Sequence, residues 1–303
     1  MTEQRRPLIS LVAINYIHIK DTIEFLESVA KLSYRETETI VVDNASPKGR
    51  PDESVKKRFP WVKFIQSEKN LGFAGGNNLG IAEASGDYIF LLNNDTLLPK
   101  DFLDPIVDFM QAHPDAGMAS PKVLYPDETT IQYAGAIGIN PVTGRGKRLG
   151  LFEKDNGQYD RNYETDLGHG AALIIRSNVV KAVGPMPELY FLYYEEHDWC
   201  MMMKRLGYKM YYIGESHIIH KESISTGGDD SPNKVYYLTR NRVIFMRRNF
   251  TGMKFFSGLL FFAAISVPSK LLKYLVRGKF ALMGAVIRGS AWHLTHLGKS
   301  SVR

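Results

Sequence analysis

Short apolar runs alternate with amphipathic stretches along the first part of the chain. Runs rich in Val, Ile, Leu and aromatic residues predict strands, and apolar side chains at three- and four-residue intervals predict the helices between them. The predicted strands are 8–16, 39–42, 62–66 and 88–92, and the predicted helices are 22–31 and 77–84. Strands that alternate with helices indicate an α/β protein with a mostly parallel sheet.

The uncharged run 88–92 leads directly into Asn93, Asn94 and Asp95, so a carboxylate is expected at the end of a buried strand. Ligands of open α/β sheets bind beyond the carboxyl ends of the strands. A single carboxylate beside a phosphate-bearing ligand commonly holds Mg²⁺ or Mn²⁺, because the phosphates complete the coordination shell. The alternative is that these three residues only begin a turn, which Asn and Asp favour.

A second strand, 39–42, ends in the same way at Asp43. That carboxylate could accept hydrogen bonds from the base or ribose of a nucleotide, or it could simply open a loop. The following segment 70–78 contains three closely spaced glycines. It is expected to form a loop with accessible backbone N–H groups that leads into a helix N-terminus, where anions bind readily.

A later helix is predicted from the apolar spacing of residues 199–206. Glu195, Glu196 and Asp198 then fall in its first turn. The helix dipole alone favours acids there, but crowded carboxylates also raise one another's pKa, as a general base requires. His220, which follows an apolar pair, could be a metal ligand or a buried core histidine.

Six segments, in this order, resemble the inverting glycosyltransferases of family 2, which have the GT-A fold. The similarity is strongest to the rhamnosyltransferase-like branch. The segments are LVAINY, IVVDNAS, NLGFAGGNNLG, YIFLLNNDT, GHGAALIIRSNVVKAVG and YEEHDWCMMMKRLGY, and with His220 they span roughly residues 8 to 225. Each segment alone is weak evidence for this family, whereas all of them in this order are specific evidence.

The resemblance implies a role for each matched position. On the donor side the implied residues are Asp43 for the nucleotide base and Asn70, Gly72, Asn77, Asn94 and Asp95 for the rest of the sugar nucleotide. Asp95 would bind the divalent cation, Mg²⁺ or Mn²⁺, together with His220. Glu196 would deprotonate the acceptor hydroxyl, with Glu195 beside it. On the acceptor side the implied residues are Gly170, Ala171, Arg176, Asp198 and Trp199.

Three positions depart from the family pattern. Asn93 replaces the first acid of the Asp-x-Asp motif, so Asp95 carries its charge alone. The pair Glu195-Glu196 replaces Glu-Asp, which lengthens the base by one methylene and leaves open which of the two acts. Pro187 stands where an Asp is common.

Charge divides the chain near residue 230. From Ser231 to Arg303 there are 13 Lys and Arg and no Asp or Glu, whereas the preceding residues hold 25 basic and 32 acidic side chains. The uncharged apolar run 255–268 is about fourteen residues long, shorter than the ~20 that a membrane-spanning helix needs, and Pro268 is expected to end it. The prediction is a catalytic domain, 1–230, and a basic amphipathic helical region, 231–303, on an anionic membrane surface.

Two other interpretations of the basic region are a helical lid over the catalytic domain and a nucleic-acid patch. No nucleic-acid-binding motif accompanies the charge, so no nucleic-acid partner is expected. The region 126–165 is polar and Gly-rich, which predicts a mobile loop or hairpin over the acceptor side. One cysteine, Cys200, fits a reducing compartment, and the N-terminal residues show no secretory signal.

These features together predict a metal-dependent inverting glycosyltransferase that is cytoplasmic and peripheral on the inner face of the cell membrane. It would move a sugar, with rhamnose a candidate, from a dTDP- or UDP-linked donor to a hydroxyl of a lipid-linked glycan in cell-surface polysaccharide synthesis. The alternatives are a transferase with a soluble or protein acceptor and an inactive sugar-nucleotide-binding scaffold. The sequence leaves the sugar, the linkage, the acceptor and homodimer formation open.

Overall fold

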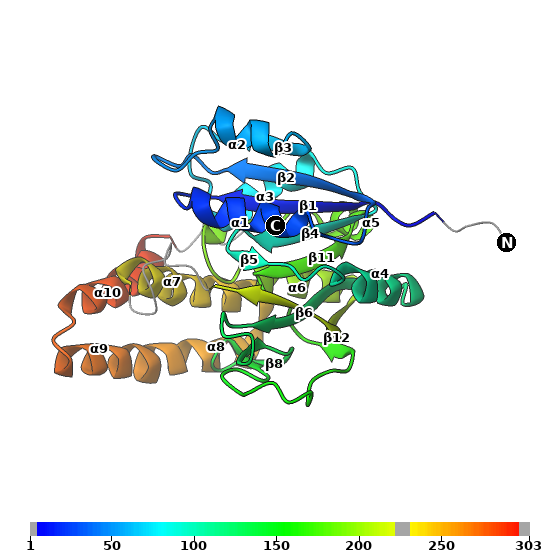
Figure 1. Cartoon of the computed structure of the whole chain (residues 1–303). Helices are drawn as coiled ribbons and strands as arrows, with labels where there is room; N and C mark the ends of the chain where they lie inside the picture. The colour runs from blue at the N-terminus through cyan, green and yellow to red at the C-terminus, as the bar shows by residue number, and fades with distance from the viewer. Residues whose placement is uncertain (1–4, 222–230, 297–303) are drawn as a thin grey trace.

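The computed structural model describes residues 5–221 and 231–296, which form a large sheet with flanking helices and a group of C-terminal helices beside it (Figure 1). The main strand order is β10-β12-β6-β11-β4-β1-β2-β3, with β5 beside β12 and β7 beside β6. The strands are β1 Ile9–Asn15, β2 Thr37–Asp43, β3 Val62–Gln66, β4 Tyr88–Asn93, β5 Thr96–Leu97, β6 Ala116–Leu124, β7 Ile131–Tyr133, β8 Ala136–Asn140, β9 Arg145–Arg148, β10 Tyr163–Thr165, β11 Ala172–Arg176 and β12 Lys209–His220.

Helices connect most of these strands and make up the C-terminal region. They are α1 Ile19–Val29, α2 Glu53–Arg58, α3 Gly72–Ala82, α4 Leu103–Ala112, α5 Ser177–Val183, η1 Glu188–Tyr190, α6 Glu195–Arg205, α7 Pro232–Asn249, α8 Gly252–Phe261, η3 Phe262–Ser266, α9 Val267–Val276 and α10 Phe280–Thr295. Strands β3, β2, β1 and β4 are parallel, β11 is antiparallel to its two neighbours, and β12 is parallel to β6. The predicted mixed, mostly parallel α/β sheet is therefore confirmed.

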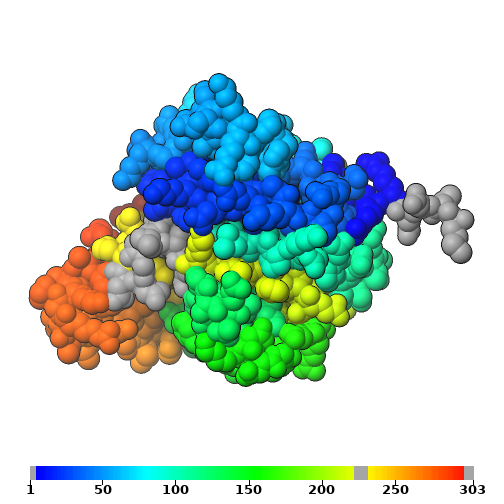
Figure 2. Space-filling view, in the orientation of Figure 1, coloured from blue at the N-terminus to red at the C-terminus, as the bar shows by residue number. Residues whose placement is uncertain are grey.

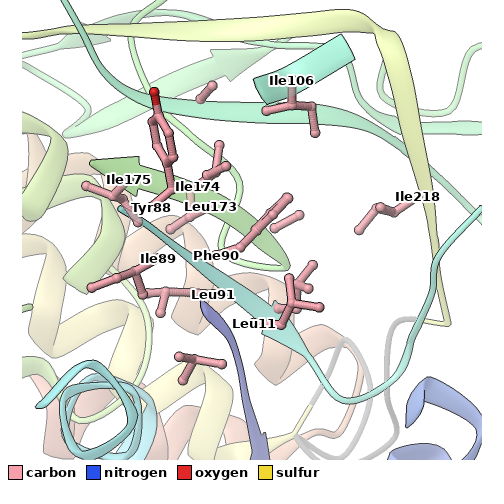
Figure 3. Packing of buried hydrophobic residues seen from close by; sticks show 14 of the residues in the cluster. Leu11, Tyr88, Ile89, Phe90, Leu91, Ile106, Leu173, Ile174, Ile175 and Ile218 are labelled. Carbon is pink, nitrogen blue, oxygen red and sulfur yellow. The ribbon is translucent and has the colours of Figure 1, made fainter. Parts of the chain in front are cut away.

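Strand β4 lies in the middle of the sheet because its apolar residues are buried on both faces. Phe90 and Leu91 are fully buried, and Figure 3 shows them packed among side chains of the neighbouring strands, including Leu11 of β1 and Leu173 of β11. Burial of such side chains contributes about 1.5–3 kcal/mol each. The ends of these strands are therefore held on a rigid base.

The strand register places several polar residues along one edge of the sheet. Asn15 at the end of β1 lies opposite Asp43 at the end of β2, and Ile14 lies opposite Asn93 at the end of β4. Because β11 is antiparallel to β4, Ala172 at its beginning lies at this same edge. The carboxyl-end edge predicted to bind the ligand thus receives residues from four strands.

The glycine-rich segment is a helix, not the loop expected from its composition. Helix α3 begins at Gly72, five residues before the predicted start. A Cβ atom on Gly80 would be 2.3 Å from Val12 Cγ1, and one on Gly76 would be 2.9 Å from Ile14 Cδ1. The glycines therefore allow α3 to pack closely on β1, although each Gly is about 1 kcal/mol less favourable than Ala in a helix.

The region 126–165 is more ordered than the mobile loop that was one of the two predictions. Strands β8 and β9 form an antiparallel hairpin, as the other alternative required. Strand β7 pairs with β6, and its residues Ile131 and Tyr133 are buried in the main core. Apolar residues at intervals in an otherwise polar segment anchor it to the sheet.

The C-terminal helices extend from one side of the sheet domain (Figures 1 and 2). Helix α10 packs along α7, whereas α8, η3 and α9 form one continuous helix from Gly252 to Val276. Pro268 was expected to end this helix, and that prediction is wrong. The π-helical turn η3 comes just before the proline, and the wider turn accommodates the ring and the missing N–H.

Candidate active site

The ends of β4 and β12 bring Asp95 and His220 together. Strand β5 follows Asp95 at once and pairs with the end of β12, so that Thr96 lies opposite His220. His220 Nε2 is 3.3 Å from Asp95 Oδ1. The two side chains are buried, with 7% and 3% of each residue exposed, respectively. A carboxylate oxygen and an imidazole nitrogen at a ligand-binding edge are suitable donors for Mg²⁺ or Mn²⁺.

Gln132 on β7 sets the orientation of the His220 ring. Its Oε1 atom is 2.6 Å from His220 Nδ1. An amide oxygen only accepts hydrogen bonds, so Nδ1 carries the proton and the lone pair of Nε2 faces Asp95. Asn93, which stands in place of an acid of the family motif, has its Nδ2 atom 3.2 Å from the same Nε2.

The donor set fits a cation whose shell is completed by substrate. Within the ranges that the structure describes, no group of three or more His, Cys, Asp or Glu side chains could hold a metal ion. Asp95 and His220 would supply two ligands, and phosphate oxygens and water would have to supply the others. Mg²⁺ is commonly bound in this way, by one or two protein ligands and substrate phosphates.

Glu195 and Glu196 begin helix α6, as predicted, and the backbone before them has an unusual conformation. Phe191, Tyr193 and Tyr194 have φ values of 65°, 68° and 80°. Non-glycine residues in this left-handed region cost about 1–3 kcal/mol each unless their surroundings fix them. The helix that carries the two carboxylates therefore begins directly after a strained segment.

Asn241 of α7 holds that segment in place from the C-terminal region. Its Nδ2 atom donates to the carbonyl oxygens of Tyr190, Leu192 and Tyr193 at 3.0, 2.7 and 2.8 Å. Asn241 is completely buried. Helix α7 is therefore part of the support of the candidate catalytic carboxylates.

The two carboxylates have opposite pKa shifts. Burial, followed by repulsion from Glu196, raises the pKa of Glu195 well above its ordinary value. Burial would also raise the pKa of Glu196, but His197 and backbone N–H groups lower it below the usual range. His197 Nδ1 is 3.1 Å from Glu196 Oε1. At neutral pH Glu196 is thus ionised and able to accept a proton, whereas Glu195 holds its proton more tightly than an ordinary carboxyl group.

Residues 169–171 connect the carboxylate pair with the Asp95–His220 edge. A Cβ atom on Gly170 would be 3.8 Å from Glu196 Oε1, so this predicted acceptor-side residue leaves space next to the carboxylate. The carbonyl of Ala171, also predicted, accepts from the N–H of Asn93 at 3.0 Å. The ring centroids of His169 and His220 are 6.1 Å apart.

Arg176 does not belong to this group, although it was predicted on the acceptor side. It lies at the far end of β11, opposite Tyr88 at the start of β4. Its guanidinium donates to the carbonyls of Ala116 and His113 at 2.8 and 3.0 Å and to the Tyr88 hydroxyl at 3.0 Å. The whole length of the strand separates it from Ala171, so its role is to tie the strand to its neighbours.

Asp198 and Trp199 were also predicted on the acceptor side, but both side chains are fully buried. The Trp199 indole N–H donates to the Gly184 carbonyl at 3.0 Å. The Asp198 carboxylate accepts from Arg248 and from Asn249, the latter at 2.7 Å, and so joins α6 to α7. Neither side chain is available to a substrate in this arrangement.

Asp43 and Asn94 lie at the ligand edge, and both are hydrogen-bonded within the protein. The Asp43 carboxylate accepts from Asn15 Nδ2 at 2.7 Å and from Gln66 Nε2 at 2.9 Å. Asn94 Nδ2 donates to a hydroxyl of helix α1 at 2.9 Å. A carboxylate has about four lone-pair sites, so Asp43 can accept further hydrogen bonds.

The remaining donor-side predictions divide into two groups. Asn70 and Gly72 lie at the start of α3, where Asn70 Oδ1 accepts from the Gly72 N–H at 2.9 Å. A Cβ atom on Gly72 would be 2.1 Å from the Phe191 carbonyl oxygen, so glycine is required for this approach. Asn77 does not face a ligand, because it is buried inside the helix and its Nδ2 atom donates to the Phe73 carbonyl at 3.1 Å.

Sequence reasoning missed Gln132, His169 and Asn241. His169 lies in the quoted segment GHGAALIIRSNVVKAVG, where a histidine between two glycines is a usable signal. Burial, followed by the nearby His220, lowers the pKa of His169 well below its ordinary value, so this ring is neutral. Gln132 and Asn241 carry no local signal, since their partners lie far away in the sequence.

The order and direction of the strands are those of the GT-A glycosyltransferase fold. The chain belongs to glycosyltransferase family 2, because the model of that family, described as Glycosyl transferase family 2, matches residues 10–182. The N-acetylglucosaminyl-diphospho-decaprenol L-rhamnosyltransferase of Mycobacterium tuberculosis is 25% identical over 251 residues, which cover 73% of this chain and 78% of that enzyme. The predicted rhamnosyltransferase-like branch is thereby confirmed.

Two further similarities cover only part of the matching protein. The uncharacterized protein y4gI of Sinorhizobium fredii is 27% identical over 255 residues, which cover 80% of this chain but 27% of that protein. A crystal structure of GalNAc-T7 with UDP, GalNAc and Mn²⁺ has a TM-score of 0.63 at 15% identity and covers 81% of this chain and 48% of that one. The latter similarity confirms the GT-A fold.

Proposed function

We propose that the chain is a metal-dependent, inverting glycosyltransferase that uses a nucleoside-diphosphate sugar. The observation that carries the proposal is the ionised Glu196 carboxylate beside Gly170, next to the sheet edge with Asp95 and His220. Glu196 Oε2 is buried and has no hydrogen-bond partner among the residues that the structure describes. A base and a cation site close to each other are what transfer from a sugar diphosphate requires.

The chemistry follows from the positions of these groups. Glu196 Oε2 takes the proton of the acceptor hydroxyl as that oxygen attacks the anomeric carbon, which becomes oxocarbenium-like. A divalent cation held by Asp95 and His220 would neutralise the charge that develops on the departing diphosphate. Attack from the face opposite the leaving group inverts the configuration, and no covalent nucleophile is needed. Glu195, whose pKa is raised, is the less available base of the two.

The donor in this proposal is a dTDP- or UDP-linked sugar, with rhamnose the leading candidate. The mycobacterial relative is named as an L-rhamnosyltransferase, and the GalNAc-T7 structure contains UDP and Mn²⁺. Asp43 would accept from the nucleotide base, and Asn70, Gly72 and Asn94 would line the rest of the donor site. The donor diphosphate would lie against Asp95.

The acceptor in this proposal is a lipid-linked glycan that is used for a cell-surface polysaccharide. The mycobacterial relative is named for a diphospho-decaprenol acceptor. In this chain the helix from Gly252 to Val276 has 25 residues; its most apolar 18-residue window has a mean hydropathy of 1.7, and 11% of that window is buried. Large apolar side chains are exposed on the C-terminal helices: Met253, Phe256, Leu260, Ile265, Leu272, Leu275, Val276, Phe280, Ile287 and Leu294.

This helix is long enough to cross a bilayer, but its contacts favour a position in the membrane surface. Ser266, near its middle, accepts a hydrogen bond from the buried Arg242 at 2.7 Å. A spanning orientation would carry that guanidinium towards the bilayer centre, which costs several kcal/mol. We therefore propose that the protein is cytoplasmic and peripheral on the inner face of the membrane, where its basic residues meet anionic lipid.

The test is a panel of UDP- and dTDP-sugars with a lipid-linked sugar acceptor, scored by release of nucleoside diphosphate. Release that needs both the acceptor and a divalent cation is the expected result. Donor binding without release under every condition would instead favour the scaffold alternative. Equal use of a lipid acceptor and a plain soluble sugar would favour the soluble-acceptor alternative.

A further inference from the structure

Three cationic side chains from three distant segments converge beside the candidate active site. They are Arg145 of β9, Arg242 of α7 and Lys270 of α9, and together they are called the basic cluster below. The β8–β9 hairpin reaches α7 here, since a Cβ atom on Gly144 would be 3.4 Å from Arg242 Cγ. A Cβ atom on Gly258 would be 2.6 Å from the Pro141 carbonyl oxygen, so α8 also meets the hairpin closely.

Arg242 is the most enclosed member of the basic cluster, with 3% of its surface exposed. Its guanidinium carbon is 5.5 Å from the ring centroid of Phe262 and 5.8 Å from that of Phe261. One donor, Nη1, binds Ser266, but Nε is buried and has no hydrogen-bond partner among the described residues. Buried donors are normally satisfied, so an orphaned guanidinium N–H indicates a missing acceptor.

The basic cluster also lacks a carboxylate partner among the residues that the structure describes. Among residues 5–221 and 231–296, no ion pair joins Arg145, Arg242 or Lys270 to a carboxylate. Burial, followed by repulsion from Arg145 and Arg242, lowers the pKa of Lys270 to about 8. Partly buried like charges destabilise a fold unless an anion joins them. Their convergence is therefore best explained by an anionic ligand.

The position of the basic cluster shows which part of a substrate would reach it. Burial raises the pKa of Tyr194, whereas Arg242 and Arg145 lower it and Glu196 raises it, so the Tyr194 hydroxyl lies near both arginines and near Glu196. Phe261 and Phe262, which flank Arg242, belong to the long helix whose outer face is apolar. The basic cluster thus lies between the proposed base and the proposed lipid surface.

We propose that the basic cluster binds the diphosphate that links the acceptor sugar to its lipid. This assignment rests on the proposed function, because it assumes an acceptor whose hydroxyl meets Glu196. With the hydroxyl at the base and the lipid chain along α8 and α9, the phosphate groups fall between them, beside the three cations. Guanidinium groups suit phosphate because their planar fork donates two parallel hydrogen bonds.

The test compares two acceptors that carry the same sugar, one on a lipid diphosphate and one on a neutral alkyl glycoside. Arg145→Gln with Lys270→Gln should lower kcat/KM for the diphosphate acceptor, relative to the neutral one, by roughly 10- to 100-fold, as loss of charge-assisted hydrogen bonds implies. The fall should be mainly in KM. Lys147→Gln, an exposed cation on β9, and Arg277→Gln, exposed after α9, are the matched controls.

A second measurement keeps the assignment testable if the chain uses no lipid acceptor at all. Inorganic diphosphate, added with excess EDTA to exclude a cation site, should bind the wild-type protein and raise its Tm, and the double variant should lose this binding. Absence of diphosphate binding by the wild type would overturn the assignment. So would an equal loss on both acceptors in the double variant, which would indicate a structural role.

The phosphate bound by the basic cluster could instead belong to the headgroup of an anionic phospholipid. Vesicles of phosphatidylglycerol, compared with neutral vesicles of phosphatidylcholine, distinguish the two sources. The assignment predicts that the double variant binds both vesicles as the wild type does. Loss of phosphatidylglycerol binding with acceptor preference unchanged would show that the basic cluster serves a lipid headgroup and would overturn the assignment. A failure of the proposed function itself would appear differently, as a wild type without transfer.

Discussion

Replacing Asn241 should impair catalysis by more than it destabilises the fold. Its side-chain NH₂ group is one of two links between α7 and the segment before Glu195, and its N–H donors are shared among three carbonyl oxygens at 2.7–3.0 Å. The other link is Arg240, which donates to the carbonyls of Leu189 and Tyr190 at 3.1 and 2.7 Å. The segment it holds contains three non-glycine residues with positive φ. Asn241→Ala removes all three contacts without touching Glu195 or Glu196, so any loss of activity must pass through the position of the segment.

The magnitude follows from the contacts. A hydrogen bond contributes about 0.5–1.5 kcal/mol net, and the amide NH₂ has two N–H donors to share among the three carbonyls, so the contacts contribute about 2 kcal/mol. Each left-handed residue stores about 1–3 kcal/mol of strain that these bonds offset, so the segment should relax locally once they are removed. A shift of about 2 kcal/mol in the local equilibrium lowers the productive population roughly 30-fold. If instead the whole loss reached global stability, Tm would fall by about 4–8 °C.

The assay combines thermal unfolding, kcat well below Tm, and hydrogen exchange of the backbone amides of residues 189–196. Faster exchange there with a large fall in kcat is the expected result. Asn233→Ala, at an exposed position of the same helix, should change none of the three. A lower Tm with normal kcat and normal exchange would refute the reasoning, since α7 would then only stabilise the fold.

Further outcomes follow from other parts of the site. Asp95→Ala should abolish transfer and leave Tm nearly unchanged, with a chelator reproducing the effect on the wild type; full activity in excess EDTA would contradict the cation site. Glu196→Gln should lower kcat by roughly 10²–10⁴-fold and Glu195→Gln by less, because the pKa of Glu196 is lowered whereas that of Glu195 is raised; a reversed order would exchange their roles. The acid limb of kcat should lie below pH 4.5, because the pKa of Glu196 is lowered from that value. Burial raises the pKa of Glu195 from 4.5, so its contribution to the free energy of unfolding is complete below pH 4.5 and is lost as pH rises through the folded pKa. In denaturant unfolding, the stability of Glu195→Gln relative to the wild type should therefore increase over that pH range. Phe256→Asp should reduce sedimentation with anionic vesicles, whereas Leu206→Asp, at an exposed leucine just after α6, should not; equal binding by both variants would count against the membrane helix.

Much of the sheet was predictable because its signals are local. Strand 62–66 has the same bounds in the structure, and strand 88–92, an uncharged apolar run, extends by one residue. The position of Asp95 followed from its place just after such a run. The start of α3 was not predictable in the same way, because glycines that disfavour a helix locally allow it to pack against Val12.

The parts of the site that escaped prediction depend on long-range pairing. His220 is fixed by Gln132, 88 residues earlier, and nothing around a lone glutamine in a polar region marks it as an orienting residue. Arg176 was misplaced for a related reason. The resemblance identified its segment correctly, but only the antiparallel direction of β11 shows that Ala172 lies at the ligand edge and Arg176 at the other.

Helix α7 joins the chemistry of the site to the C-terminal helices through two consecutive residues. Neighbouring residues on a helix point about 100° apart, so Asn241 supports the segment before Glu195 while Arg242 faces Ser266 of the long apolar helix. A membrane surface that moved α8 and α9 would therefore act on the catalytic carboxylates through a single rigid element. The boundary predicted near residue 230 separates two regions of different composition. A chain cut there would nevertheless lose the contacts of α7 with the segment before Glu195. We expect such a chain to bind the donor without transferring the sugar.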